Sequence, residues 1–424
     1  GPAPEDSTDV MSWINSLNNP NHLFINGSWT KSKASKKIQV INPATNKKLT
    51  SLSIANKADV NAAVGAAKKA YNSWSKTTPD TRAKYLYALA RLIQKHSRFL
   101  SVLETIDNGK PIRETRDIDI PLVARHFYYH AGWAKKIDTK THKPIGVIGQ
   151  IIPWNFPLLM MAWKIAPAIA AGNTVVLKPA EFTSLTALYF AELCQKAKIP
   201  KGVINIITGD GSTGELITSH VDTKKIAFTG STEVGKKIIQ STATQEKKLT
   251  MELGGKSPFI VFEDADLDSA VEGVVDAIWF NQGQVCCAGS RLLVQESVEK
   301  IFIKKLKARM EKLRVGNPLD KSIDIGAIVA PVQLKKIQSI VKKGEKEGSK
   351  LWQPTWACPT DGLFYPPSIF TNVSPSSFIA QVEIFGPVLS VLSFRTPSEA
   401  VTIANNTPYG LAASIWSENI NLAL

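Results

Sequence analysis

The stretch TVVLKPAEFTSLTALYFAELCQKAKIPKGVINIITG, residues 174–209, decides the fold class. It opens with a β-branched strand, Thr174 to Leu177, and closes with a second apolar strand, Val203 to Ile207. Between them, apolar residues recur at helical spacing from about Ser184 to Ala197. Two short apolar strands joined by a helix are typical of a parallel sheet that is covered on both faces.

The same alternation extends in both directions from this unit. Further strands are predicted at 146–152, 226–228 and 249–253, and helices at 158–171, from 213 onward and at 233–241. We therefore predict an α/β fold whose first part is a Rossmann-like, doubly wound parallel sheet. Ligands of such sheets bind beyond the carboxyl ends of the strands, so site residues are expected in those loops.

A second α/β unit begins at Lys256, after the flexible pair Gly254-Gly255. Its predicted strands and helices alternate as in the first unit and cover 257–262, 267–280, 291–295 and 298–314. We predict two domains, 1–253 and 254–424. The first domain includes an N-terminal helical part, 1–130, in which residues 58–107 have helical spacing, and a short segment, 134–144.

Composition excludes several classes of protein. With 424 residues, 44% hydrophobic and 21% charged, the chain resembles an average globular protein. Four cysteines do not make a disulfide framework and favour a reducing compartment. Prolines and polar residues break the apolar run 145–172, which excludes a membrane span there. Residues 1–20 do not read as a secretory signal, so we predict a cytoplasmic protein; its first residue, Gly1, suggests a fragment or a processed chain.

The net charge of +15 does not point to nucleic acid. A nucleic-acid surface would concentrate its basic residues in one stripe with interleaved aromatics. Here the lysines form scattered groups at 135–143, 304–312 and 335–350, and the last two alternate with apolar residues as solvated helix faces do. We predict no nucleic-acid partner, and an anionic partner of another kind stays the alternative.

A nucleophile candidate lies in the segment NQGQVCCAG, residues 281–289. A cysteine in a glycine-rich polar loop can present its sulfur beside free backbone N–H groups, which favours Cys286 or Cys287 as a reactive thiol. The alternative is a pair of inert buried thiols. Cys194 falls within a helical pattern and is predicted to be a core residue.

Two further polar residues follow predicted strands. Glu252, beside Gly254-Gly255, would act as a general base if it faced the crevice; otherwise it is a surface residue paired with Lys256. Asn155, between Pro153 and Pro157, would donate to an oxyanion; otherwise it belongs to a structural turn.

Two glycine-rich loops could hold phosphate. The segment 209–214, GDGSTG, fits the pattern G-x-G-x-x-G between a strand and a helix, and 230–235, GSTEVG, follows the next strand. Both could instead be ordinary turns, and Lys178 and Glu181 could be ordinary surface charges. The six histidines have no metal-ligand spacing, so no metal site is predicted.

Six of these segments occur together in the order of a known family. Taken together, the chain resembles the NAD(P)-dependent aldehyde dehydrogenase superfamily from about Phe24 to Trp416. The segments are Pro153-Trp154-Asn155, Lys178-Pro179-Ala180-Glu181, Phe228-Thr229-Gly230-Ser231, Glu252-Leu253-Gly254-Gly255-Lys256, Gly283-Gln284-Val285-Cys286 and Glu383-Ile384-Phe385-Gly386-Pro387. The runs 107–114 and 270–277 are most similar to family 16, whose full chains carry a second, related domain.

The resemblance implies a role for each candidate. It makes residues 1–253 the NAD-binding domain and 254–424 the catalytic domain, with Cys286 as nucleophile, Asn155 as oxyanion donor together with the Cys286 N–H, and Glu252 as general base. Glu181 favours NAD over NADP by repelling a 2′-phosphate. The implied cofactor contacts are Ile152, Pro153, Trp154, Lys178, Glu181, Gly211, Ser212, Gly230, Ser231, Thr232, Gly235, Leu253, Glu383 and Phe385. The family places Gly211 and Ser212 near the adenine, so their loop is expected to contribute less to phosphate binding than its pattern suggests.

The implied activity is oxidation of a small-molecule aldehyde to its acid, through a thiohemiacetal and a thioester on Cys286, with NAD as the hydride acceptor. The alternatives are a thiol esterase and a non-catalytic scaffold that binds a protein partner. Expected partners are a second copy of the chain or a second related domain. The segment from Trp133 to Pro144 is shorter than the association segment of many members, and the family's last glycine-rich segment is absent before Leu424, so the catalytic domain is expected to be incomplete.

Overall fold

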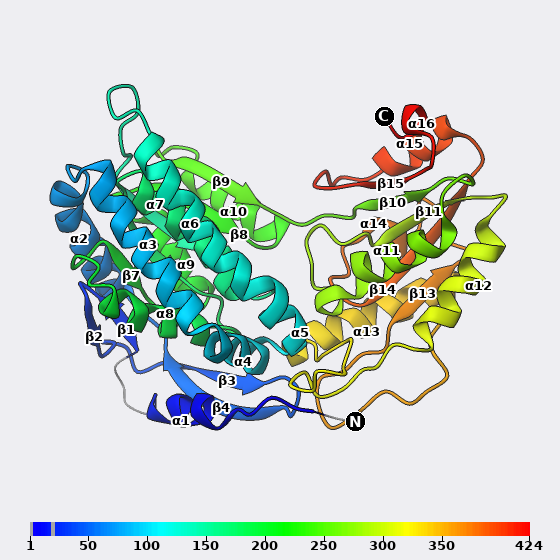
Figure 1. The fold of residues 1–424 in the computed structure, drawn as a ribbon, viewed down its shortest axis with the longest axis horizontal. Coiled ribbons are helices and arrows are strands. Elements are labelled where there is room, and N and C mark those ends of the chain that lie inside the picture. Colours follow the sequence, from blue (N-terminus) through cyan, green and yellow to red (C-terminus); the bar gives the residue numbers. More distant parts are fainter. Residues whose placement is uncertain (1–2, 18–21) are drawn as a thin grey trace.

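The computed structural model describes residues 3–17 and 22–424. Figure 1 shows two lobes, each built on one sheet, with the chain passing between them after β9. The first lobe holds a seven-stranded sheet in the order β2 (Ser28–Thr30), β1 (Leu23–Ile25), β7 (Ile204–Ile206), β6 (Thr174–Lys178), β5 (Val147–Ile151), β8 (Thr223–Thr229) and β9 (Lys248–Glu252). Strands β5 to β9 run parallel, as predicted, and β1 is antiparallel to β7.

Helices cover both faces of this sheet. Along β6, Val175 and Leu177 pack into one hydrophobic cluster and Val176 into another, because successive side chains of a strand point to opposite faces. The first cluster contains α7 and α8, and the second contains α2 and α9. The helices of this lobe are α1 (Thr8–Ser16), α2 (Lys57–Trp74), α3 (Pro79–Lys95), α4 (Ser97–Asn108), α5 (Ile112–Glu114), a π-helical turn (Thr115–Asp119), α6 (Ile120–Lys136), α7 (Pro157–Ala170), α8 (Leu185–Lys196), α9 (Gly211–Ser219) and α10 (Thr232–Thr242).

The second lobe holds a six-stranded sheet with its own core. Its order is β12 (Lys350–Trp352), β13 (Ser368–Thr371), β14 (Val388–Phe394), β11 (Arg291–Gln295), β10 (Pro258–Val261) and β15 (Ser414–Trp416). All neighbours are parallel except β12 and β13. Its helices are α11 (Leu267–Trp279), a 3-10 turn (Phe280–Gly283), α12 (Glu299–Met310), α13 (Pro331–Lys346), α14 (Phe378–Gln381), α15 (Pro397–Asn405) and α16 (Ile420–Ala423).

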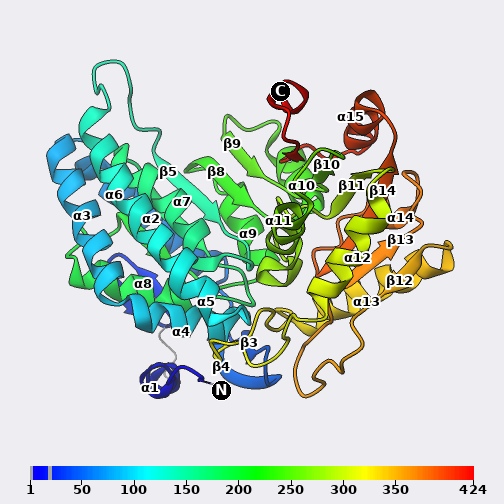
Figure 2. The same cartoon turned by 45° about the vertical axis from the view of Figure 1, so that its right-hand side comes forward.

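The prediction of a helical part over 1–130 is wrong in one respect. Besides its helices, this part contains β1, β2 and a separate hairpin of β3 (Lys37–Asn42) and β4 (Lys47–Ser53). Strands β1 and β2 have three residues each, and the hairpin is partly exposed, so neither gives a clear alternation of apolar and polar residues. The segment after α6 is a projecting loop that leads to β5 (Figure 2).

Main-chain hydrogen bonds join the two lobes along a line that we call the seam, residues 109–112 against 318–327. The N–H of Ala327 donates to the oxygen of Gly109 at 2.9 Å, and the N–H of Ile112 donates to the oxygen of Pro318 at 2.7 Å. Gly109 ends α4 with φ +94°, and a Cβ there would lie 2.7 Å from the main-chain oxygen of Ala327. Glycine is therefore required for the close approach of the two backbones.

Candidate active site

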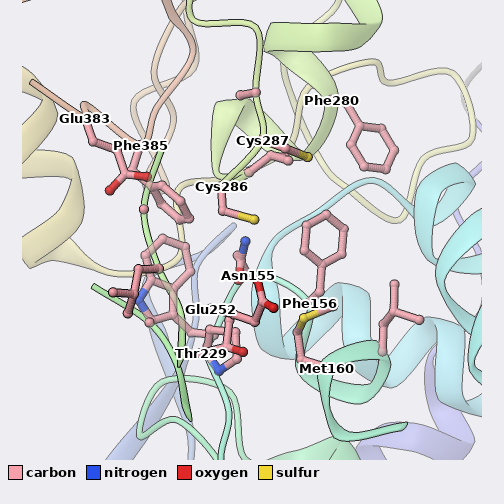
Figure 3. A pocket seen from close by; sticks show the side chains of 18 of the residues that line it. Asn155, Phe156, Met160, Thr229, Glu252, Phe280, Cys286, Cys287, Glu383 and Phe385 are labelled. Atoms are coloured by element: carbon pink, nitrogen blue, oxygen red, sulfur yellow. The ribbon is translucent and has the colours of Figure 1, made fainter. Parts of the chain in front are cut away.

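The strand order places a crevice at β5. Chain order in the first sheet runs away from β5 in both directions, toward β6 and β7 on one side and toward β8 and β9 on the other. The loops that leave β5 and β8 therefore diverge and leave a gap at the carboxyl edge. The loop 280–289 of the second lobe closes this gap and leaves a cavity of about 610 Å³ (Figure 3). Its size is typical of small-molecule sites, which are about 300–1,000 Å³.

The three predicted catalytic residues line this one cavity. Asn155 is 4% exposed, and its Nδ2 donates to the main-chain oxygen of Gln284 at 2.8 Å. An amide nitrogen carries two N–H donors, so the second one remains for a substrate oxygen. Figure 3 shows the sulfur of Cys286 directed toward this amide. Glu252 lines the cavity from the end of β9.

The loop that carries the cysteines has a strained backbone. Asn281 and Gln282 have φ of +47° and +56°, in the left-handed region that non-glycine residues rarely adopt. Both oxygens of Glu114 accept from the N–H of Asn281, at 3.1 and 3.0 Å. Asn281 Nδ2 in turn donates to the main-chain oxygen of Asn155 at 2.8 Å. These bonds fix the loop and the oxyanion donor against each other, and strain of this kind is typical of functional sites.

The two thiols interact with each other. Cys286 is half-buried and Cys287 is exposed. The neighbouring Cys287 side chain, together with burial, raises the pKa of Cys286, and the Cys286 side chain lowers the pKa of Cys287 to about 6. Position distinguishes the two sulfurs, because that of Cys287 points away from Asn155 (Figure 3).

Lys164 belongs to the neighbourhood of Glu252 and was not among the predicted site residues. It lines a second cavity together with Glu252, is 8% exposed, and its Nζ donates to Oγ1 of Thr229 at 2.5 Å. Burial lowers the pKa of Lys164 to about 8, although Glu252 acts in the opposite direction. The signal in the sequence was a lone charge within the apolar helix α7.

Lys178 provides a polar donor at the end of β6. It is 3% exposed, and its Nζ donates to the oxygens of Pro179 at 2.9 Å and Gly209 at 3.0 Å. The nearest Glu181 oxygen is 3.9 Å away, and burial lowers the pKa of Lys178. An ammonium has three N–H donors, so one remains for a hydroxyl such as that of a ribose.

The two glycine-rich loops differ in how their helices are capped. At the start of α9, the carboxylate of Asp210 accepts from the N–H of Ser212 at 2.9 Å and from its hydroxyl at 2.6 Å. At the start of α10, the neutral hydroxyl of Ser231 accepts from the N–H of Val234 at 3.3 Å. A carboxylate repels phosphate, so the anion fits the α10 terminus rather than the G-x-G-x-x-G loop.

Glu383 and Phe385 reach the cavity from the second lobe. Glu383 Oε1 accepts from the N–H of Gly255 at 2.9 Å, and burial raises the pKa of Glu383. The ring of Phe385 packs edge-on against Trp154 at 5.1 Å between centroids, with φ of +58°. Gln333 Nε2 holds this backbone by donating to the oxygen of Phe385 at 2.8 Å. Sequence reasoning missed Gln333, which lies in α13, far from any motif.

The predicted cofactor residues fall into two groups. Seven line the large cavity: Pro153, Trp154, Gly230, Ser231, Leu253, Glu383 and Phe385. Seven lie outside its lining: Ile152, Lys178, Glu181, Gly211, Ser212, Thr232 and Gly235. Gly235 has a structural reason to be glycine, because a Cβ there would lie 2.5 Å from the side chain of Leu253.

Within 3–17 and 22–424, no three or more His, Cys, Asp and Glu side chains are grouped so that they could hold a metal ion. Over the same ranges, no helix combines the length and the apolar character needed to cross a membrane.

Comparison with known proteins places the chain. Residues 29–424 match the profile of the aldehyde dehydrogenase family. The mitochondrial aldehyde dehydrogenase of Rattus norvegicus is 44% identical over 439 residues, covering 100% of this chain and 83% of the relative. An aldehyde dehydrogenase of Emericella nidulans is 44% identical over 432 residues, covering 98% and 87%.

The fold agrees with solved structures of the same family. The NAD⁺ complex of an aldehyde dehydrogenase from Bacillus cereus superposes with a TM-score of 0.94 at 39% identity, covering 99% of this chain and 88% of that chain. The α/β fold predicted from the sequence is thereby confirmed. The finer assignment to family 16 stays a prediction, since these relatives do not distinguish it. The chain belongs to the aldehyde dehydrogenase family.

Proposed function

We propose that this protein oxidises an aldehyde to the corresponding carboxylic acid, with NAD as the hydride acceptor. The observation that carries the proposal is that Cys286, Asn155 and Glu252, from three separate segments, line one cavity beside the uncharged cap of α10. Family membership supports the same reaction class.

The first step is nucleophilic attack. The Cys286 thiol loses its proton to solvent, the resulting thiolate adds to the aldehyde carbon, and the carbonyl π electrons move to the oxygen, which becomes an oxyanion. The free N–H of Asn155 and the backbone N–H of Cys286 bind this oxyanion, and one such donor contributes about 3 kcal/mol. Asn155 is held for this task by its bond to the oxygen of Gln284.

The second step releases the product. Bound NAD supplies the acceptor for the hydride that leaves the thiohemiacetal carbon. The oxyanion collapses to a carbonyl, which leaves a thioester on Cys286. Glu252 then takes a proton from a water molecule, the hydroxide adds to the thioester carbon, and the sulfur leaves as the thiolate.

The two lobes have different roles in the proposed reaction. We propose that residues 1–253 bind the cofactor, through Lys178 and the α10 terminus, while 254–424 supply the nucleophile. NAD is favoured over NADP because the Glu181 carboxylate beside Lys178 would repel a 2′-phosphate. The free donor of Lys178 and the neutral cap of α10 fit a ribose hydroxyl and a pyrophosphate.

The test is NADH formation, followed by absorbance, with NAD and a panel of short and long aldehydes. We expect the wild-type chain to form NADH, Cys286→Ala to form none, and Cys287→Ala to keep most of the rate. Ester hydrolysis without NADH formation from any aldehyde would instead identify a thiol esterase. Turnover of neither substrate class would contradict the proposal.

A further inference from the structure

A third cavity, lined by polar residues, lies at the opposite edge of the first sheet from the active site. Its volume is about 260 Å³, and it lies where the chain enters β5 and β6, between the start of α3 and the loop 137–146. Figure 2 shows this loop projecting from the helical side of the first lobe. The lining residues are Ser75, Lys76, Thr77, Thr78, Pro79, Arg82, Ile137, Thr139, His142, Lys143, Pro144 and Ala171.

Arg82 is the unusual residue of this cavity. It is 2% exposed, and its Nε has no hydrogen-bond partner among the described residues. Within those residues, it also forms no ion pair. Its guanidinium lies against Gly172, where a Cβ would collide with Nη1. Arginine keeps its charge in proteins, so a buried guanidinium without an acceptor is costly.

The rest of the lining adds positive charge and hydroxyl groups. Lys76, Lys143 and His142 line the cavity together with the hydroxyl groups of Ser75, Thr77, Thr78 and Thr139. Of the described residues, no aspartate or glutamate lines it.

The carboxylates adjacent in sequence to this lining have other partners. Asp80 pairs with Lys135 at 3.2 Å, and Asp138 accepts from the N–H of Lys140 and the hydroxyl of Thr141, both at 2.9 Å. The cavity therefore gathers cations and donors without a counter-charge.

We propose that this cavity binds a phosphate group, free or carried by a small molecule, with Arg82 as its central ligand. The guanidinium fork matches two oxygens of a phosphate, and hydrogen bonds between charged partners are the strong ones. Lys143 and the hydroxyls of Ser75 and Thr139 are the further donors of the lining, because the Thr77 hydroxyl already donates to the main-chain oxygen of Trp74. The cavity exceeds one phosphate in size, so it accommodates a small group attached to it.

Inorganic phosphate is the probe, added at constant ionic strength against chloride. Because a ligand that binds only the folded state stabilises it, the melting midpoint of the wild-type chain rises with phosphate and saturates. Arg82→Met keeps the apolar volume and removes the unpaired charge. This variant melts at or above the phosphate-free wild type and does not respond to phosphate.

Two lysines of the loop 137–146 provide a test variant and its matched control. Lys143→Ala, which removes a lining charge, moves the response to higher phosphate concentration. Lys140→Ala, which removes an exposed charge that does not line the cavity, leaves the response unchanged. Repeating the titration with glycerol phosphate distinguishes free phosphate from phosphate carried by a small molecule. The compound whose effect on the melting midpoint saturates at the lower concentration is the preferred ligand.

Three results would overturn the proposal. The wild-type midpoint does not change with phosphate; Arg82→Met shows the same rise, which marks a general salt effect; or Lys140→Ala weakens the response as much as Lys143→Ala. If Arg82→Met does not fold, Arg82→Lys replaces it, because lysine keeps the charge but lacks the two-pronged guanidinium. The ³¹P line broadening of phosphate is then compared between wild type and Arg82→Lys. Equal broadening contradicts the proposal.

Discussion

The side-chain amide of Asn281 donates a hydrogen bond to the main-chain oxygen of Asn155, with 2.8 Å between nitrogen and oxygen. The first residue belongs to the cysteine loop of the second lobe, and the second to the loop after β5. This bond crosses between the lobes and sets the distance from the nucleophile to the oxyanion donor. Asn281 is therefore a positioning residue for the proposed reaction.

Replacing Asn281 by alanine is expected to lower kcat by about 10- to 100-fold, because small misplacements of reacting groups have effects of this size. The KM for NAD is expected to change little. Asn46→Ala is the matched control, since Asn46 also has a left-handed backbone, φ +52°, but lies in the β3–β4 hairpin. Steady-state kinetics that show equal kcat for both variants would contradict the positioning role.

Glu114 is expected to make stability depend on pH. Burial raises its pKa from 4.5 to about 8, so the folded state binds the proton more tightly than the unfolded state. The stabilisation is complete below pH 4.5 and is lost as the pH rises toward 8. In Glu114→Gln, the free energy of unfolding in urea should fall less over this range than in wild type. Exposed Glu246→Gln is the control, and an unchanged slope in Glu114→Gln would rule out this account.

Lys164 is expected to tune the general base. Its charge interacts favourably with Glu252, so Lys164→Met removes a stabilisation of the ionised carboxylate. We expect the acid limb of the rate–pH profile to move to higher pH in Lys164→Met. Lys225→Met is the control, because Lys225 lines the same second cavity from β8. If the rate–pH profiles of wild type and Lys164→Met coincide, either the general base is not Glu252 or the charge of Lys164 does not affect it.

Glu181 is expected to determine the choice of cofactor. Glu181→Gln keeps the shape and removes the charge that opposes a 2′-phosphate, so the KM for NADP should fall by about tenfold or more, as one charge contact of about 1.4 kcal/mol implies. Glu215→Gln removes an exposed carboxylate from the neighbouring helix α9 and should have no effect. The ratio of kcat/KM for NAD and NADP is the measurement, and a ratio unchanged by Glu181→Gln would assign the preference elsewhere.

Local periodicity was sufficient to predict the regular part of the fold. The predicted strand at 174–177 is β6, and the predicted helix from 184 to 197 is α8, because both carry a long and clear apolar pattern. The hairpin of β3 and β4 was missed because its strands are partly exposed. The alternation of strands and helices predicted a parallel sheet. In such a sheet the carboxyl ends of the strands meet at one edge, and Asn155 and Glu252 both follow strands there.

The contacts that support the site could not be predicted from the sequence. Glu114 and Asn281 are 167 residues apart, and no sequence pattern around either residue predicts their hydrogen bond. The loop 209–214 matches a phosphate motif, but Asp210 supplies a negative charge at the helix terminus itself. A sequence motif specifies residue types and their spacing. The charge at the start of a helix also depends on whether a side chain such as Asp210 turns toward the first N–H groups, which the motif does not specify.

The seam between the lobes has a consequence for how the protein unfolds. Its bonds join main chain to main chain, so separating the lobes would break them and exchange them for bonds to water. A side chain at position 109 would collide with the main chain of Ala327, so these bonds depend on glycine there. We therefore expect the two sheets, each with its own core, to melt together, and calorimetry should record a single transition whose calorimetric and van't Hoff enthalpies agree.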